Sequence, residues 1–146
     1  IRNEKYIGND KSLSNLKDID KQKKIGKEIG KKMMIYFDVD IDKKLPWRVT
    51  IDMKKLMVEI GQVSLTYFEV ENVSNEDIVG YSVFDIVPKE IAQYFIKIQC
   101  FCFENQLIRA GEKVRFPLLF IIDKQVEDYN ISDMTMYYYF SLIKRV

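Results

Sequence analysis

The stretch Met-Met-Ile-Tyr-Phe-Asp-Val-Asp-Ile, residues 33–41, decides the fold class of this chain. Every second side chain from Met33 to Ile41 is apolar, and most of the side chains between them are polar or amphipathic. A period of two places the apolar set on one face of a β-strand and the other set on the opposite face. We therefore predict a half-buried strand that turns one face toward a core.

Further strand patterns follow, separated by turn residues such as Gly61-Gln62 and the polar cluster 72–77. The segment after Pro88 differs, because its apolar residues recur at helical spacing and predict one short helix: Ile91, Tyr94, Phe95 and Ile98. The expected strand pieces are 33–41, 48–53, 56–60, 63–70, 80–87, 106–109, 114–122 and 135–143. Roughly seven short strands with a single helix indicate an all-β sandwich.

The 146 residues suggest one folded domain, which we place at residues 32–146. Residues 1–31 are rich in lysine and turn-forming residues and are predicted to be a flexible linker. The chain contains no apolar run long enough to span a membrane, and it begins at Ile1 without a methionine. We therefore interpret the chain as a fragment or a processed form that has lost targeting or anchoring segments. A net charge of +1 gives no argument for nucleic-acid binding.

The chain contains no histidine. This excludes, within one chain, catalysis by Ser-His-Asp or Cys-His groups and zinc sites that use imidazole. A transition-metal site would have to be built mainly from cysteine, methionine or carboxylates. The paired methionines at 33–34 and at 134 and 136 lie in or beside strand patterns, so we interpret them as core residues.

The two cysteines, Cys100 and Cys102, are separated by one residue. In an extended backbone their Cα atoms would lie about 6.5–7 Å apart, with both side chains on one face. Disulfides join Cα atoms about 4.4–6.8 Å apart, so a bond between these cysteines would need a bent backbone. Two thiolates on one face suit Cu(I), which prefers soft sulfur ligands. A zinc site would need four ligands, and this chain has only two cysteines and no histidine to supply them.

The spacing alone leaves three other interpretations open. Cys100 and Cys102 could be small buried side chains in a strand whose Phe101 and Phe103 occupy the other face. They could cycle between thiols and a disulfide in a redox protein. The domain could also be an interaction module with inaccessible cysteines.

The residues around the pair add a resemblance. The run Tyr94-Phe95-Ile96-Lys97-Ile98-Gln99-Cys100-Phe101-Cys102-Phe103-Glu104 resembles the signature of the CtaG family of cytochrome c oxidase assembly proteins. The likeness extends over roughly residues 32–143 and includes Leu45-Pro46-Trp47, Val87-Pro88, Gln93-Tyr94-Phe95, Gln106-Leu107, Ala110-Gly111-Glu112, Phe116-Pro117-Leu118 and Phe120-Ile121-Ile122-Asp123.

This resemblance implies a membrane-anchored copper chaperone with an immunoglobulin-like β-sandwich domain, and not an enzyme. Its two Cys-Phe-Cys cysteines, which match Cys100 and Cys102 here, would bind Cu(I) for the Cu-B centre in subunit I of cytochrome c oxidase. The domain would face the bacterial periplasm, or the intermembrane space from the mitochondrial inner membrane, and could form copper-bridged homodimers. The family's transmembrane helix and further cysteine do not appear in this chain, and we expect both upstream of Ile1.

Overall fold

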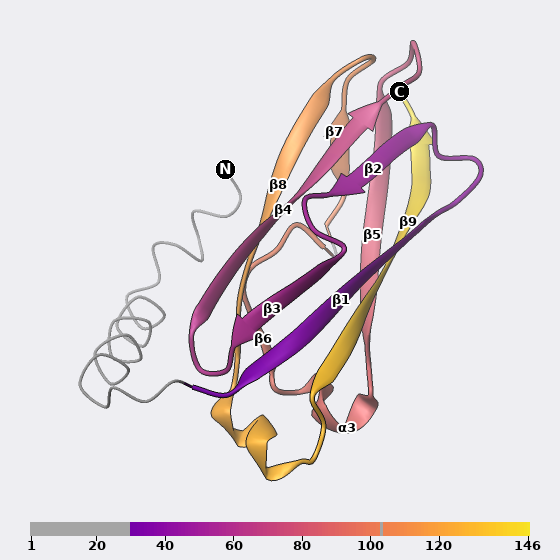
Figure 1. Cartoon of the computed structure of the whole chain (residues 1–146). Helices are drawn as coiled ribbons and strands as arrows, with labels where there is room; N and C mark the ends of the chain where they lie inside the picture. The colour runs from indigo at the N-terminus through magenta and orange to yellow at the C-terminus, as the bar shows by residue number, and fades with distance from the viewer. Residues whose placement is uncertain (1–29, 103) are drawn as a thin grey trace.

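Two β-sheets pack face to face in the computed structural model, which describes residues 30–102 and 104–146 (Figure 1). Along the chain the elements are β1 (Lys32–Ile41), β2 (Trp47–Ile51), β3 (Lys55–Glu59), β4 (Val63–Asn72), β5 (Ile78–Val87), α3 (Lys89–Ala92), β6 (Phe95–Gln99), β7 (Gln106–Ile108), β8 (Lys113–Ile122), the 3₁₀ helix η1 (Lys124–Asp128) and β9 (Asp133–Arg145). The predicted all-β sandwich with one short helix is confirmed. The predicted linker falls almost entirely on residues outside the described part.

One sheet has five strands in the order β3-β1-β9-β5-β7, and the other has four in the order β2-β4-β8-β6. Every pair of neighbouring strands is antiparallel except β1 and β9, which run parallel. The first and last strands therefore lie side by side, and β9 is the middle strand of the larger sheet (Figure 1).

The alternation along residues 33–41 has the predicted structural meaning. Met33, Ile35 and Phe37 are buried between the sheets, whereas Tyr36 and Asp38 are exposed on the outer face. The partner strand β9 follows the same rule, since Met134 and Met136 are fully buried beside Ile35 and Phe37. The interpretation as core residues is confirmed for these three methionines.

The predicted helix is wrong beyond its first turn. Helix α3 ends at Ala92, and after a turn at residues 93–94 the edge strand β6 begins at Phe95 and pairs with β8. Phe95 stacks on Phe120 of β8 with ring centroids 4.7 Å apart, so pairing with β8 buries its ring. A short apolar run fits the periodicity of a helix as well as that of a strand. Here the contact with β8 favours the strand.

Trp47 and Gly80 show how closely the two sheets approach. The indole ring of Trp47, from the four-stranded sheet, lies directly over Gly80 of the five-stranded sheet. A Cβ atom at position 80 would overlap this ring, so only glycine fits without a shift of Trp47. The indole also meets Phe140 edge-on, at 6.4 Å between ring centroids.

Candidate functional site

Cys100 and Cys102 lie in the segment that crosses from one sheet to the other. Strand β6 is the edge of the four-stranded sheet and β7 is the edge of the five-stranded sheet. The extended backbone ends at Gln99, the residue before Cys100, and Cys102 lies in a turn. The pairing of β6 with β8 already shifts register between Lys97 and Gln99.

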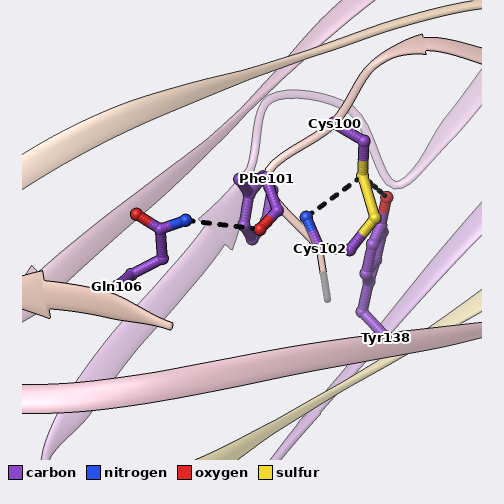
Figure 2. Close-up of a disulfide and its surroundings, with 5 residues drawn as sticks. All are labelled: Cys100, Phe101, Cys102, Gln106 and Tyr138. Atoms are coloured by element: carbon purple, nitrogen blue, oxygen red, sulfur yellow. Dashed lines mark hydrogen bonds between the residues drawn. A yellow bond between two sulfur atoms is a disulfide. The ribbon is translucent and has the colours of Figure 1, made fainter. Parts of the chain in front are cut away.

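The bent backbone that a bond between the two cysteines was expected to need is therefore present. Because the backbone bends after β6, their Cα atoms are 5.5 Å apart and their sulfurs are joined in a disulfide (Figure 2). A bond between cysteines this close in sequence requires such a bend. The structure thus brings the two predicted ligand atoms together, in their oxidised form.

The disulfide is buried, and the ring of the intervening Phe101 belongs to an aromatic cluster. Cys100 is 7% exposed and Cys102 6% exposed. Phe101 points into the core, where its ring stacks on Phe116 at 4.6 Å and on Tyr138 at 6.0 Å between centroids. The packing role considered for Phe101 is confirmed, whereas Phe103 lies outside the described residues.

Tyr138 of β9 is a neighbour of the pair that the sequence did not predict. Its hydroxyl lies 3.7 Å from Cys100 Sγ, and its side chain is fully buried (Figure 2). Burial raises the pKa of Tyr138 far above its usual value, so the hydroxyl keeps its proton and can donate to sulfur. Only the pairing of distant strands brings residue 138 beside residue 100, so no local pattern could have found it.

Two further hydrogen bonds hold the bend. The backbone N–H of Cys102 donates to Cys100 Sγ at 3.4 Å. The side-chain amide of Gln106 donates to the carbonyl oxygen of Phe101, also at 3.4 Å. Cys100 Sγ can therefore receive two donors, one from the backbone and one from Tyr138.

Lys97 lies nearby on β6. Its amino group sits over the ring of Phe84 at 4.8 Å from the centroid, and partial burial lowers the pKa of this amine. Phe84 in turn packs against Tyr138, with ring centroids 5.6 Å apart. A chain of contacts thus leads from Lys97 through two rings to the cysteine pair.

The donor atoms at the site are few. Within residues 30–102 and 104–146, no group of three or more histidine, cysteine or acidic side chains is arranged to hold a metal ion. The two sulfurs offer a pair of soft donor atoms. Such a pair fits a low-coordinate ion such as Cu(I) once reduced, and it does not fit a closed four-ligand zinc site.

These features define the class of domain: it is a β-sandwich in which the segment that crosses from one sheet to the other carries a bonded pair of cysteines. The sequence profile described as "Cytochrome c oxidase assembly protein CtaG/Cox11" matches residues 5–141, and the chain belongs to that family.

Curated relatives come from mitochondria and bacteria. The mitochondrial cytochrome c oxidase assembly protein COX11 of Saccharomyces cerevisiae is 37% identical over 114 residues, which cover 75% of this chain and 38% of the relative. The cytochrome c oxidase assembly protein CtaG of Ehrlichia ruminantium (strain Gardel) is 35% identical over 116 residues, which cover 79% of this chain and 64% of the relative. CtaG of Bradyrhizobium diazoefficiens is 31% identical over 120 residues, covering 80% and 56%. The match thus spans less than two thirds of each of these relatives.

Proposed function

We propose that this chain is the copper-carrying domain of an oxidase assembly factor and not an enzyme. Cys100 and Cys102 bind Cu(I) as thiolates, and the ion passes to the Cu-B centre in subunit I of cytochrome c oxidase. The observation that carries the proposal is the pairing of the only two cysteines at one bend. The relatives' names, which describe cytochrome c oxidase assembly proteins, support the destination.

Loading requires the reduced pair. The disulfide takes up two electrons from an external thiol or phosphine reductant, and two protons from that thiol or from water, to give two thiols. One Cu(I) ion then binds both sulfurs and displaces two protons. Because thiolate is the form that binds metals, loading is favoured by conditions that deprotonate the pair.

Transfer follows from the small donor set. Two sulfurs leave Cu(I) open to a further ligand, which a thiolate or imidazole of the recipient, a cysteine upstream of Ile1 or a second copy of this chain can supply. Exchange of ligands then moves the ion without free copper being released. A copper-bridged homodimer is one form in which the open position is filled.

The location follows from the same proposal. A membrane anchor upstream of Ile1 would hold the domain in the bacterial periplasm, or in the intermembrane space at the mitochondrial inner membrane. In the described part of the chain no helix combines the length and apolarity needed to cross a bilayer.

The proposal is tested by loading the reduced protein with Cu(I) without oxygen and measuring copper per chain. We expect Cys100→Ser with Cys102→Ser to abolish stoichiometric binding. Met53→Leu with Met57→Leu is the matched control, because both methionines are far more exposed than the core methionines. Equal copper in the parent and the cysteine variant would overturn the proposal. Sedimentation of loaded and unloaded protein distinguishes a copper-bridged dimer from a monomer.

One observation favours a second candidate, a thiol–disulfide redox protein: the sulfurs are already bonded. In that case one thiolate of a substrate dithiol would attack the disulfide and form a mixed disulfide. The second substrate thiolate would then displace the protein sulfur, so that the substrate leaves as a disulfide while Cys100 and Cys102, after uptake of two protons, become thiols. The burial of both sulfurs opposes rapid attack. Catalytic oxidation of a dithiol peptide in the absence of metal would favour this function over copper delivery.

A further inference from the structure

The outer face of the five-stranded sheet carries tyrosines set between aspartates. On this face, Asp38 of β1 and Asp85 of β5 are both register partners of Tyr137 of β9. One step along, Asp40 is the partner of Tyr139. We call these five residues the Asp-Tyr face.

The side chains of the Asp-Tyr face are open to solvent. All five residues are exposed, Tyr137 at 46% and Tyr139 at 43%. A shallow hollow of about 380 Å³ lies along residues 38–40 of β1 and 137–139 of β9. The face therefore offers aromatic surface and negative charge together, with room for a ligand group.

No cation of the described chain neutralises these carboxylates. Asp40 and Asp85 accept hydrogen bonds from the backbone N–H of the next residue, which uses one oxygen of each. The side-chain ion pairs within residues 30–102 and 104–146 lie elsewhere, between Arg48 and Glu71 and between Arg115 and Asp52. Nor do these aspartates form part of a cluster suited to a metal ion, among the residues that the structure places.

The opposite sheet shows which group such a surface accepts. There, Arg115 stacks over the ring of Tyr67 at 4.5 Å and pairs with Asp52 at 3.1 Å. A planar guanidinium can stack on a ring face and pair with a carboxylate at the same time, and an ammonium group does this less well. The Asp-Tyr face repeats the combination of tyrosine and aspartate without its own arginine.

We infer that the Asp-Tyr face is a docking surface for an arginine-bearing extended segment of a partner protein. The guanidinium groups stack on Tyr137 and Tyr139 and pair with the aspartates beside them. The spacing supports an extended partner, because residues two apart on a strand repeat about every 6.5–7 Å. This interaction is independent of copper binding, since it uses the outer face of the sheet and the cysteines lie inside.

The probe is a fluorescent peptide of alternating arginine and glycine, added to the full chain and followed by fluorescence anisotropy. We expect saturable binding that weakens as salt is raised, because exposed charge pairs are screened. A peptide of alternating lysine and glycine should bind more weakly, and one of alternating glutamate and glycine should not bind.

Asp38→Asn with Asp85→Asn should weaken binding of the arginine peptide about five- to tenfold, since each exposed pair contributes modestly. Tyr137→Ser should weaken it, whereas Tyr137→Phe should retain it because the ring face remains. Glu127→Gln with Asp128→Asn is the matched control, because it removes the same charge from exposed positions on η1.

Three outcomes would overturn the inference. Equal weakening by the Asp-Tyr variants and the η1 control would mean that only net charge matters. Unchanged binding in all variants would place the peptide elsewhere. Self-association of the chain that Tyr137→Ser abolishes, without peptide binding, would assign the face to a second copy instead. Circular dichroism of each variant confirms that the fold is intact.

Discussion

At the scale of single residues, Tyr138 links the core to the cysteine pair. Its ring packs on Phe68 at 4.5 Å and on Phe101, while its hydroxyl meets Cys100 Sγ. The ring and the hydroxyl therefore have separable roles, since phenylalanine would keep the first and remove the second.

We predict that Tyr138→Phe lowers the free energy of unfolding by about 1 kcal/mol, because a buried hydrogen bond is lost while the packing stays. Urea unfolding measures the change. Tyr137→Phe is the control, because that side chain is exposed and removal of its hydroxyl should change stability very little. Equal effects of the two substitutions would contradict a specific contact with sulfur. Copper stoichiometry should stay unchanged in both variants, since neither removes a sulfur.

The cysteine residues also show where prediction from sequence ends. The identity and spacing of Cys100 and Cys102 are enough to indicate a soft-metal pair. The sequence does not reveal that the backbone bends there, because nothing local to the Cys-Phe-Cys run shows that β6 ends at Gln99. The contact between Tyr138 and Cys100 could not be predicted for a related reason, because it depends on how β9 pairs with the other strands of its sheet.

At the scale of elements, Asn72 fixes the turn between β4 and β5. This fully buried side chain donates hydrogen bonds to the carbonyl oxygens of Glu76 at 2.7 Å and Ile108 at 2.9 Å. Its amide oxygen accepts from the N–H of Ser74 at 3.0 Å and from the Ser74 hydroxyl at 2.7 Å. One side chain thus joins the turn to strand β7.

We predict that Asn72→Ala lowers the free energy of unfolding by about 2–4 kcal/mol, because it leaves buried carbonyl groups without a donor. Asn72→Asp should not restore stability, since a carboxylate cannot donate to those carbonyls. Thermal and urea unfolding measure both variants. Asn130→Ala provides the control at an exposed position. A loss at position 72 no larger than at position 130 would refute the role assigned to Asn72.

The elements are predictable to the extent that their patterns are local. Alternation predicts β1, and the polar cluster 72–77 predicts a turn, although not the buried role of Asn72. The segment after Pro88 is ambiguous, because its apolar spacing satisfies a helix while the partner strand β8 requires a strand. The Asp-Tyr face is likewise hidden, since only the parallel register of β1 and β9 sets Asp38 beside Tyr137.

At the scale of the whole molecule, the disulfide contributes little to holding the sandwich together. The bond joins cysteines only two positions apart, whereas the core extends through both sheets. A chain-entropy model gives about 1.5 kcal/mol for so short a loop.

We therefore predict that reduction of the disulfide lowers the free energy of unfolding by no more than about 1.5 kcal/mol and leaves the protein folded. Urea unfolding with and without a phosphine reductant measures this change, and Cys100→Ser with Cys102→Ser shows whether the reductant acts elsewhere. A loss of roughly 3 kcal/mol or more, which is typical of a structural disulfide, would mean that the pair is a structural staple.

The central position of β9 has a consequence for synthesis on the ribosome. Strands β3 and β1 on one side and β5 and β7 on the other have no common partner in their sheet until residues 133–145 emerge. The nascent chain can make hairpins early, but its larger sheet can be assembled only after residues 133–145 have been translated. A ribosome that stalls before Asp133 would release two half-sheets with open edges, which are the features that recruit chaperones and promote aggregation.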